Sequence, residues 1–137
     1  MDNGKLKMDN VMENKPIHNG PRRNVLMEKV TAFSVRMVKA EQYLKNTKQE
    51  KVMSKQILRS GTSIGANCTE AQNAQSKADF INKLSIALKE ADETKYWLHL
   101  LKEGNFITDE MFNSTMADIK EICALLVTII KTTKSKM

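Results

Sequence analysis

The sequence KVMSKQILRSGTSIGANCTEAQNA, residues 51–74, decides the fold of this chain. Its middle is rich in glycine, serine and threonine, which usually mark a turn. Small and apolar residues nevertheless continue through it at alternating spacings of four and three: Met53, Ile57, Ser60, Ile64, Asn67 and Ala71. This spacing places side chains on one face of a helix. We therefore expect an uninterrupted helix through Gly61 and Gly65.

The two glycines need a compensating contact, because each costs about 1 kcal/mol relative to alanine inside a helix. A neighbouring backbone that approaches the small side chains closely would provide it. We expect this segment to be the innermost helix of a bundle. The GxxxG spacing of Gly61 and Gly65 matches neither phosphate-binding nor dinucleotide-binding glycine motifs, and no strand precedes it.

The composition is that of one all-α domain. The chain has 137 residues with 2 prolines, 5 glycines and 9 methionines, which is long enough to bury a core without disulfides or metals. The formal net charge of +6 makes an anionic partner such as RNA plausible without selecting one. Cys68 and Cys123 lie on apolar helix faces outside any CxxC pair and are expected to be reduced core residues.

Three further helices flank the central one. The first runs from the N-cap Asn24 to about residue 46, the third from the N-cap Ser76 to 103, and the last from the N-cap Thr108 to about 132. Gly104 is expected to end the third helix. The apolar seams of the first, third and last helices are, respectively, Leu26, Val30, Phe33, Met37, Ala40 and Leu44; Phe80, Leu84, Ala87, Ala91, Thr94, Leu98 and Leu101; and Phe112, Met116, Ile119, Cys123, Leu126 and Ile130.

Short connections predict an antiparallel up-down-up-down four-helix bundle over residues 24–132. Residues 1–23 are expected to form a disordered or extended tail, and residues 133–137 a basic C-terminal tail. The third helix carries more apolar residues than one core stripe requires, including Ile86, Tyr96 and Trp97. This surplus indicates a subunit interface; the alternative is a wide core stripe.

The segments LRSGTSIGAN (residues 58–67) and EAQ (70–72) resemble the bacterial 23S rRNA intervening-sequence proteins. The resemblance continues in SKADF (76–80), KLSIALKEA (83–91), ET (93–94) and YWL (96–98). It implies ring-like homopentamers of antiparallel four-helix bundles without established enzymatic activity. It also implies a relation to the accessory variability determinant of diversity-generating retroelements, a basic pentamer that binds nucleic acid and a reverse transcriptase.

The candidate nucleic-acid contact is a basic stripe along the start of the second helix. Lys51, Lys55 and Arg59 are spaced four residues apart, and Lys48 precedes them. Such a stripe could follow a phosphate backbone through non-specific charge contacts. The alternative is a solvated helix face near Glu50.

A second candidate site is a polar network or interface. Arg59, Ser63, Asn67 and Glu70 continue along nearly one face of the second helix. The third helix offers Lys83, Glu90 and Glu93, with Tyr96 and Trp97 beyond them. We expect Arg59 or Lys83 to pair with Glu70, Glu90 or Glu93, either within a chain or between subunits. A structural network and a partner-binding strip both fit this pattern.

No catalytic, metal or cofactor site is expected. The histidines, His18 and His99, lack the Glu-x-x-His context of di-iron bundles, and one histidine in the folded part gives a catalytic triad little support. No apolar stretch reaches membrane-span length, so a cytoplasmic location is expected. The leading interpretation is a non-enzymatic homo-oligomer associated with RNA or the ribosome; the alternative is a protein-binding adaptor.

Overall fold

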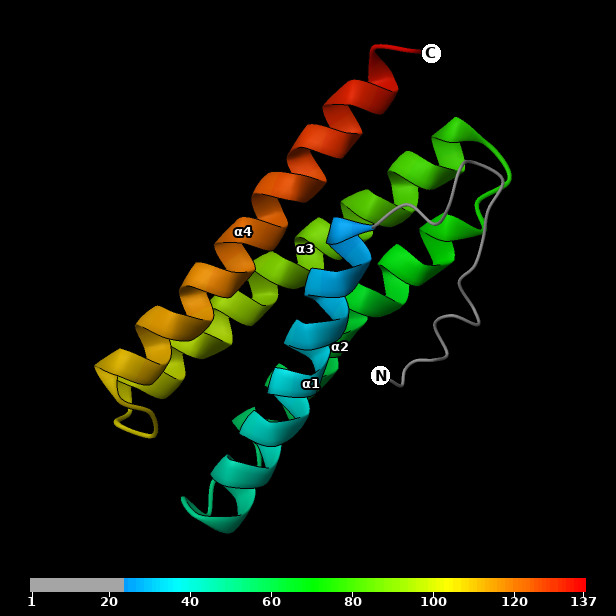
Figure 1. Ribbon diagram of the computed structural model, residues 1–137. Coiled ribbons are helices and arrows are strands. Elements are labelled where there is room, and N and C mark those ends of the chain that lie inside the picture. The colour runs from blue at the N-terminus through cyan, green and yellow to red at the C-terminus, as the bar shows by residue number, and fades with distance from the viewer. Residues whose placement is uncertain (1–23) are drawn as a thin grey trace.

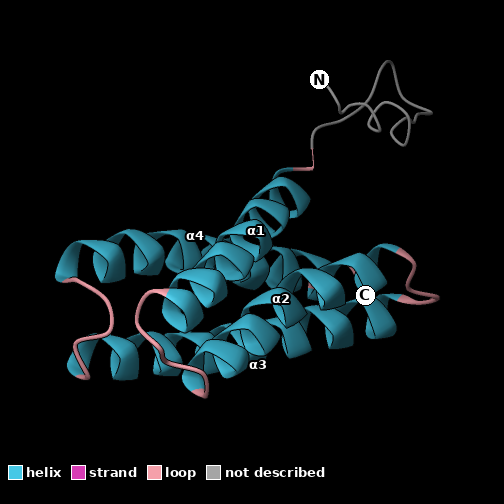
Figure 2. Ribbon diagram, turned by 90° about the horizontal axis from the view of Figure 1, so that it is seen from below, coloured by secondary structure: helices cyan, strands magenta, loops and turns pink. Residues whose placement is uncertain are grey.

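The computed structural model describes residues 24–137. Its elements are α1 (Val25–Asn46), α2 (Met53–Gln72), α3 (Lys77–Glu103) and α4 (Asp109–Lys134). Over these residues the chain consists of helices and their connections only, as Figure 2 shows. The all-α prediction of four helices is confirmed, whereas the tail expected over residues 1–23 lies outside the described part.

Consecutive helices pack against each other, and α4 also meets α1, so the four helices enclose one core (Figure 1). The loops 47–52 and 104–108 lie near each other, since both line one surface hollow. At the other end Lys77 Nζ donates to the carbonyl of Lys136 at 3.0 Å. The α1–α4 pairing is the least extensive of the four.

Three helix starts follow the predicted capping. Asn24 Oδ1 accepts from the backbone N–H of Met27, and Thr108 Oγ1 accepts from that of Met111. Ser76 Oγ accepts from the N–H of Asp79, whose carboxylate accepts from the N–H of Gln75. The bonds to Asn24, Ser76 and Thr108 each satisfy an orphan donor of a first helical turn.

The helix ends differ from the predictions in three places. The second helix covers Met53–Gln72, shorter at both ends than residues 51–74, and α4 continues to Lys134, two residues into the expected C-terminal tail. Gly104 caps α3 with a φ of −83°, and Asn105 takes the left-handed conformation at 65°. A Cβ at Gly104 would lie 3.2 Å from both the Leu100 carbonyl and the Phe106 ring, so a larger residue would require these neighbours to shift by a few tenths of an ångström.

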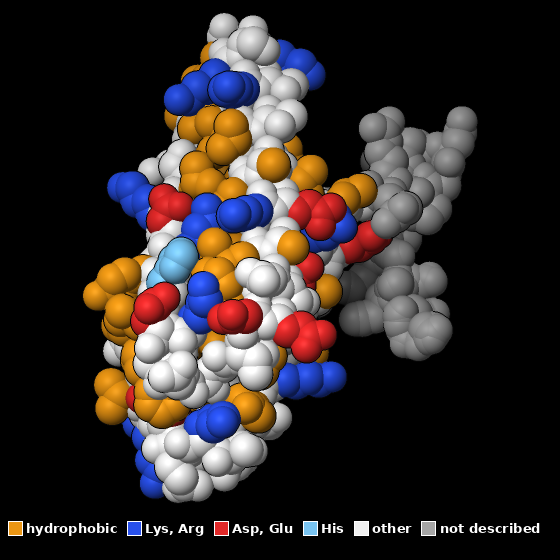
Figure 3. All heavy atoms as spheres, turned by 90° about the vertical axis from the view of Figure 1, so that its left-hand side faces the viewer, with side chains coloured by type: hydrophobic (Ala, Val, Ile, Leu, Met, Phe, Trp, Pro, Cys, Tyr) orange, Lys and Arg blue, Asp and Glu red, His pale blue; other side chains and the backbone are white. Residues whose placement is uncertain are grey.

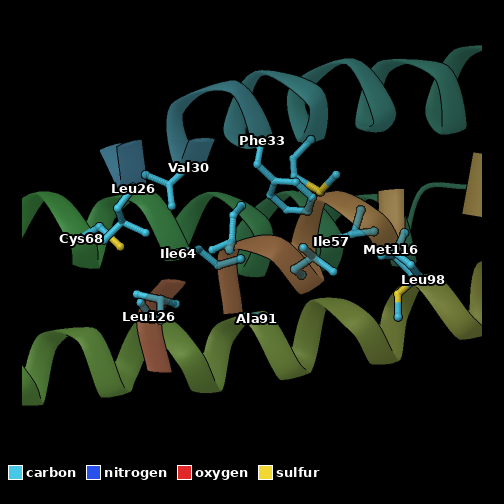
Figure 4. Packing of buried hydrophobic residues seen from close by; sticks show 14 of the residues in the cluster. Leu26, Val30, Phe33, Ile57, Ile64, Cys68, Ala91, Leu98, Met116 and Leu126 are labelled. Atoms are coloured by element: carbon cyan, nitrogen blue, oxygen red, sulfur yellow. The ribbon is translucent and has the colours of Figure 1, made fainter. Parts of the chain in front are cut away.

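The core contains most of the predicted seams, and Figure 4 shows Phe33, Ile57, Ile64 and Leu126 directed into it. The prediction for one α4 position was wrong. Ile122 is 1% exposed and fills the core, whereas Cys123 is half-buried. Cys123 belongs to the predicted stripe and Ile122 is its neighbour in sequence. The rotation of α4 about its axis, set by its packing on α1 and α3, places Ile122 in the core.

The glycine-bearing run is helical, and α1 packs closely against it. A Cβ at Gly65 would lie 3.0 Å from Ser34 Oγ and 3.5 Å from the Val30 carbonyl of α1. At Gly61 a Cβ would lie 2.7 Å from Met37 Sδ. The expected approach of a neighbouring backbone is therefore seen at Gly65, with α1 as the neighbour, whereas at Gly61 the Met37 side chain of α1 occupies the space.

Both cysteines are free thiols. Cys68 is completely buried, and this burial raises the pKa of its thiol to about 11. Burial also raises the pKa of the Cys123 thiol. Within residues 24–137, no helix is both long and apolar enough to serve as a membrane span.

We expect Gly61→Ala to destabilise the protein and Gly65→Ala to be nearly neutral. Both gain about 1 kcal/mol of helix propensity. Overpacking costs about 1–3 kcal/mol, and it applies at Gly61 because Met37 is 1% exposed and enclosed. Ser34, opposite Gly65, is half-buried rather than enclosed, so we expect its hydroxyl to yield the few tenths of an ångström that a Cβ at 3.0 Å requires. Urea unfolding followed by circular dichroism, at one protein concentration, measures both variants. Equal stabilisation of the two would contradict close packing at Gly61.

Candidate functional site

Three of the four predicted nucleic-acid contacts form an exposed basic strip. Lys48 lies in the loop 47–52, Lys51 precedes α2, and Lys55 is in its first turn; all three are exposed. Among residues 24–137, none of these ammonium groups forms an ion pair with a carboxylate. We call Lys48, Lys51 and Lys55 the lysine strip.

Glu50 lies within the lysine strip in sequence but is directed inward. Its Oε1 accepts from the backbone N–H of Ser54 at 2.8 Å, and its Oε2 accepts from those of Val52 and Met53 at 3.2 and 3.1 Å. Its exposed fraction is 9%. The carboxylate thus caps the positive end of α2 and does not neighbour the lysines as a free surface acid. The sequence signal was an acid just before a helix, a position that the helix dipole favours.

Arg59, the fourth predicted contact, does not join the lysine strip. Its guanidinium donates to Glu90 at 3.3 Å and to Glu93, both on α3. These two carboxylates raise the pKa of Arg59, with the Glu93 hydrogen bond as the largest cause. Its charge is therefore compensated within the chain, and Arg59 belongs to the polar network alone.

The predicted pairings between α2 and α3 are present within one chain. Besides Arg59, Lys83 Nζ lies 2.9 Å from Glu70 Oε1, and this contact raises the pKa of Lys83. Ser63 and Asn67, also predicted as members, donate instead to carbonyls one turn back on α2, those of Arg59 and Ser63. The network is therefore two ion-pair groups rather than one continuous strip.

Trp97 extends the network around Glu93. Its indole Nε1–H donates to Glu93 Oε2 at 3.0 Å. This bond is the largest cause of the lowered pKa of Glu93, followed by the bond from Arg59. Tyr96 packs edge-on against Trp97, with ring centroids 5.3 Å apart. Glu93 is consequently held as a carboxylate between a cation and an indole.

Sequence patterns missed two sets of polar contacts. Thr94 Oγ1 donates to Ser60 Oγ at 2.8 Å in the buried interface of α2 and α3. Along α1 and α4, Lys29 pairs with Glu121 at 3.0 Å and Arg36 with Asp118 at 2.7 Å. The seven-residue spacing of Lys29 and Arg36 was a usable signal, but their partners depend on the helix register.

Apolar side chains remain exposed on the outer side of α3. Tyr96 is 56% and Leu100 is 36% exposed, and they lie one turn apart. Trp97 and Ile86 are half-buried. The face of the molecule seen in Figure 3 shows hydrophobic side chains interspersed with charged ones. We call Tyr96 and Leu100 the apolar α3 face.

We expect the fluorescence of Trp97, the single tryptophan, to report the protonation of Glu93. The folded-state pKa of Glu93 is lowered, so Glu93 stabilises the fold above its unfolded pKa of about 4.3. That contribution is lost as pH falls through the lowered folded value. An acid titration should therefore show an emission step below the ordinary glutamate range. Glu93→Gln should abolish the step, and Glu103→Gln, on the same helix, should retain it. A step that persists in Glu93→Gln would refute the assignment.

The family model described as 23S rRNA-intervening sequence protein matches residues 22–128. A crystal structure from Bacteroides thetaiotaomicron, of a protein with unknown function from the S23 ribosomal protein family, is 58% identical in sequence. The match has a TM-score of 0.78 and covers 79% of this chain and 96% of that one. A comparison with curated proteins gives no match.

The family match extends from two residues before Asn24 into the C-terminal half of α4, and so includes the glycine-bearing helix, the lysine strip and the polar network. Its length and the sequence identity of the structural relative support one conclusion. The chain belongs to the 23S rRNA-intervening sequence protein family.

Proposed function

We propose that this protein is a non-catalytic, self-associating scaffold that binds RNA in the bacterial cytoplasm. Its framework would be an antiparallel up-down-up-down bundle, in keeping with the short loops and the pairing of successive helices. The observation that carries RNA binding is the lysine strip, with three exposed ammonium groups that lack carboxylate partners within residues 24–137.

The local electrostatics favour a polyanion at the lysine strip. Lys51 lies just before α2 and Lys55 in its first turn, four residues apart in sequence, so adjacent phosphates of an extended strand could reach both. Glu50, the acid between Lys48 and Lys51 in sequence, uses its carboxylate to cap α2. The family description, an rRNA-intervening sequence protein, and the ribosomal family name of the B. thetaiotaomicron relative favour RNA among polyanions.

We expect single-stranded RNA to bind with an affinity that falls steeply as salt rises. Each neutralised phosphate contributes about 0.7 to the slope of log K against log salt. The double variant Lys51→Glu, Lys55→Glu should therefore bind more weakly and lose about 1.4 from that slope. Fluorescence anisotropy with a labelled oligonucleotide at several salt concentrations measures both quantities.

A matched control separates the lysine strip from the overall charge. Lys89→Glu with Lys120→Glu makes the same charge change at exposed lysines of α3 and α4. This variant should retain most of the binding and the wild-type salt slope. Equal losses in the two double variants would refute a localised contact, and an absence of wild-type binding would refute RNA association.

Self-association is the second part of the proposal, and the apolar α3 face supports it. Exposed aromatic and aliphatic side chains at adjacent turns are enriched at subunit contacts. The homopentamer implied by the resemblance would place this face against a neighbouring subunit. The alternative function, a protein-binding adaptor, would use the same face for another protein and would keep its partner at high salt, unlike an RNA complex.

We expect the wild-type protein to have a solution mass that is a multiple of its 15.6 kDa chain, fivefold for the pentamer. Tyr96→Ser with Leu100→Ser should lower this mass because the change places hydroxyls in an apolar contact. Val35→Ser with Val38→Ser, at exposed valines of α1, serves as the control. Size-exclusion chromatography with light scattering measures all three. A monomeric wild type, or equal masses throughout, would exclude this interface.

A further inference from the structure

A hollow of about 250 Å³ lies at the end of the bundle where the loops 47–52 and 104–108 meet. The residues that line it include the aromatic Tyr43 and Phe106 together with the polar Lys48, Lys102 and Asn105. Ligand pockets commonly have about 300–1,000 Å³. At about 250 Å³ this hollow lies just below that range, which limits its ligand to about the size of one nucleotide.

The charges that line the hollow favour an anion. Within residues 24–137, Lys48 and Lys102 have no carboxylate partner. The ammonium of Lys102 is positioned by the ring of Phe112, 4.8 Å from its centroid. The one acid in the lining, Asp109, is the first residue of α4, where the helix dipole offsets its charge. Two lysines and an asparagine thus line a hollow that has a single acid, and the lysines outnumber it.

The hollow is continuous with the lysine strip through Lys48, which belongs to both. A strand whose phosphates follow Lys55, Lys51 and Lys48 would reach the hollow at its end. There the rings of Tyr43 and Phe106 offer apolar surface for a base, and the ammonium groups offer hydrogen bonds for a phosphate. The strip alone has no aromatic residue, so the hollow supplies what base contact requires.

We infer that this hollow binds a nucleoside monophosphate group, with its phosphate on Lys48 and Lys102 and its base against Tyr43 and Phe106. The inference rests on the proposed RNA binding, because it assigns the hollow to the terminal nucleotide of the bound strand. It predicts that an RNA strand with a 5′-phosphate at its end binds more tightly than one with a 5′-hydroxyl.

The test compares short single-stranded RNAs that carry a 5′-phosphate or a 5′-hydroxyl, using anisotropy. Loss of a charged hydrogen bond corresponds to about a tenfold change in affinity, so the phosphorylated strand should bind about tenfold more tightly. Lys102→Met retains the aliphatic stem against Phe112 and removes the charge. It should abolish the preference by weakening the phosphorylated strand far more than the hydroxyl strand, and Lys102→Arg should restore it. Lys89→Met is the matched control.

A second measurement separates this inference from RNA binding. Adenosine monophosphate and inorganic phosphate are each titrated into the protein while NMR follows the amides of Asn105 and Phe106. Shifts with the nucleotide that Lys102→Met removes support the hollow, even if no RNA binds. Equal shifts with inorganic phosphate alone show that the base is not recognised and overturn the inference. RNA binding without end preference and without these shifts overturns it too, while the proposed function stands.

Discussion

The close approach of α1 to the glycine face of α2 is the contact on which the rest of the structure depends. Gly61 and Gly65 leave space that Met37 and Ser34 occupy. Because α2 also packs extensively on α3, it is enclosed on two sides. The polar network lies along the remaining, polar surface of α2, and the lysine strip runs into the start of that surface from the loop 47–52.

Local electrostatics divide that polar surface into two regions with different properties. At the start of α2, Glu50 is used as a helix cap, so the neighbouring lysines keep their charge for a partner. Farther along α2, Arg59 is bound by two glutamates from α3, and its charge is compensated. A single basic stripe in the sequence is therefore a contact surface at one end and a structural ion-pair group at the other.

The ion pairs at the bundle surface are exposed enough that each contributes little to stability. Their effect is to fix the register in which neighbouring helices pack against each other. Lys29 and Arg36 pair with two α4 acids, and Arg59 and Lys83 link α2 with α3. Charged pairs of this kind discriminate against sliding or rotation of one helix on another, since a shifted register separates the paired charges. The buried Thr94–Ser60 hydrogen bond adds the same constraint inside the core.

The sequence by itself determined the helices, most of the core seam and three of the four N-caps, because these depend on residues close together in the chain. Hydrophobic periodicity and capping are properties of one or two turns, and they do not require a partner. The pairing partners of Arg59 and Lys83 were predictable as a set, since oppositely charged residues lie on consecutive helices.

Only the tertiary structure decided which side chains are buried or paired within the chain and which remain available to a partner. Helix rotation selected Ile122 over Cys123 for the core, and the loop conformation turned Glu50 inward. The proximity of the loops 47–52 and 104–108 brought Lys48 and Lys102 to one hollow. These outcomes depend on distances between segments far apart in the chain, which periodicity along one helix does not encode.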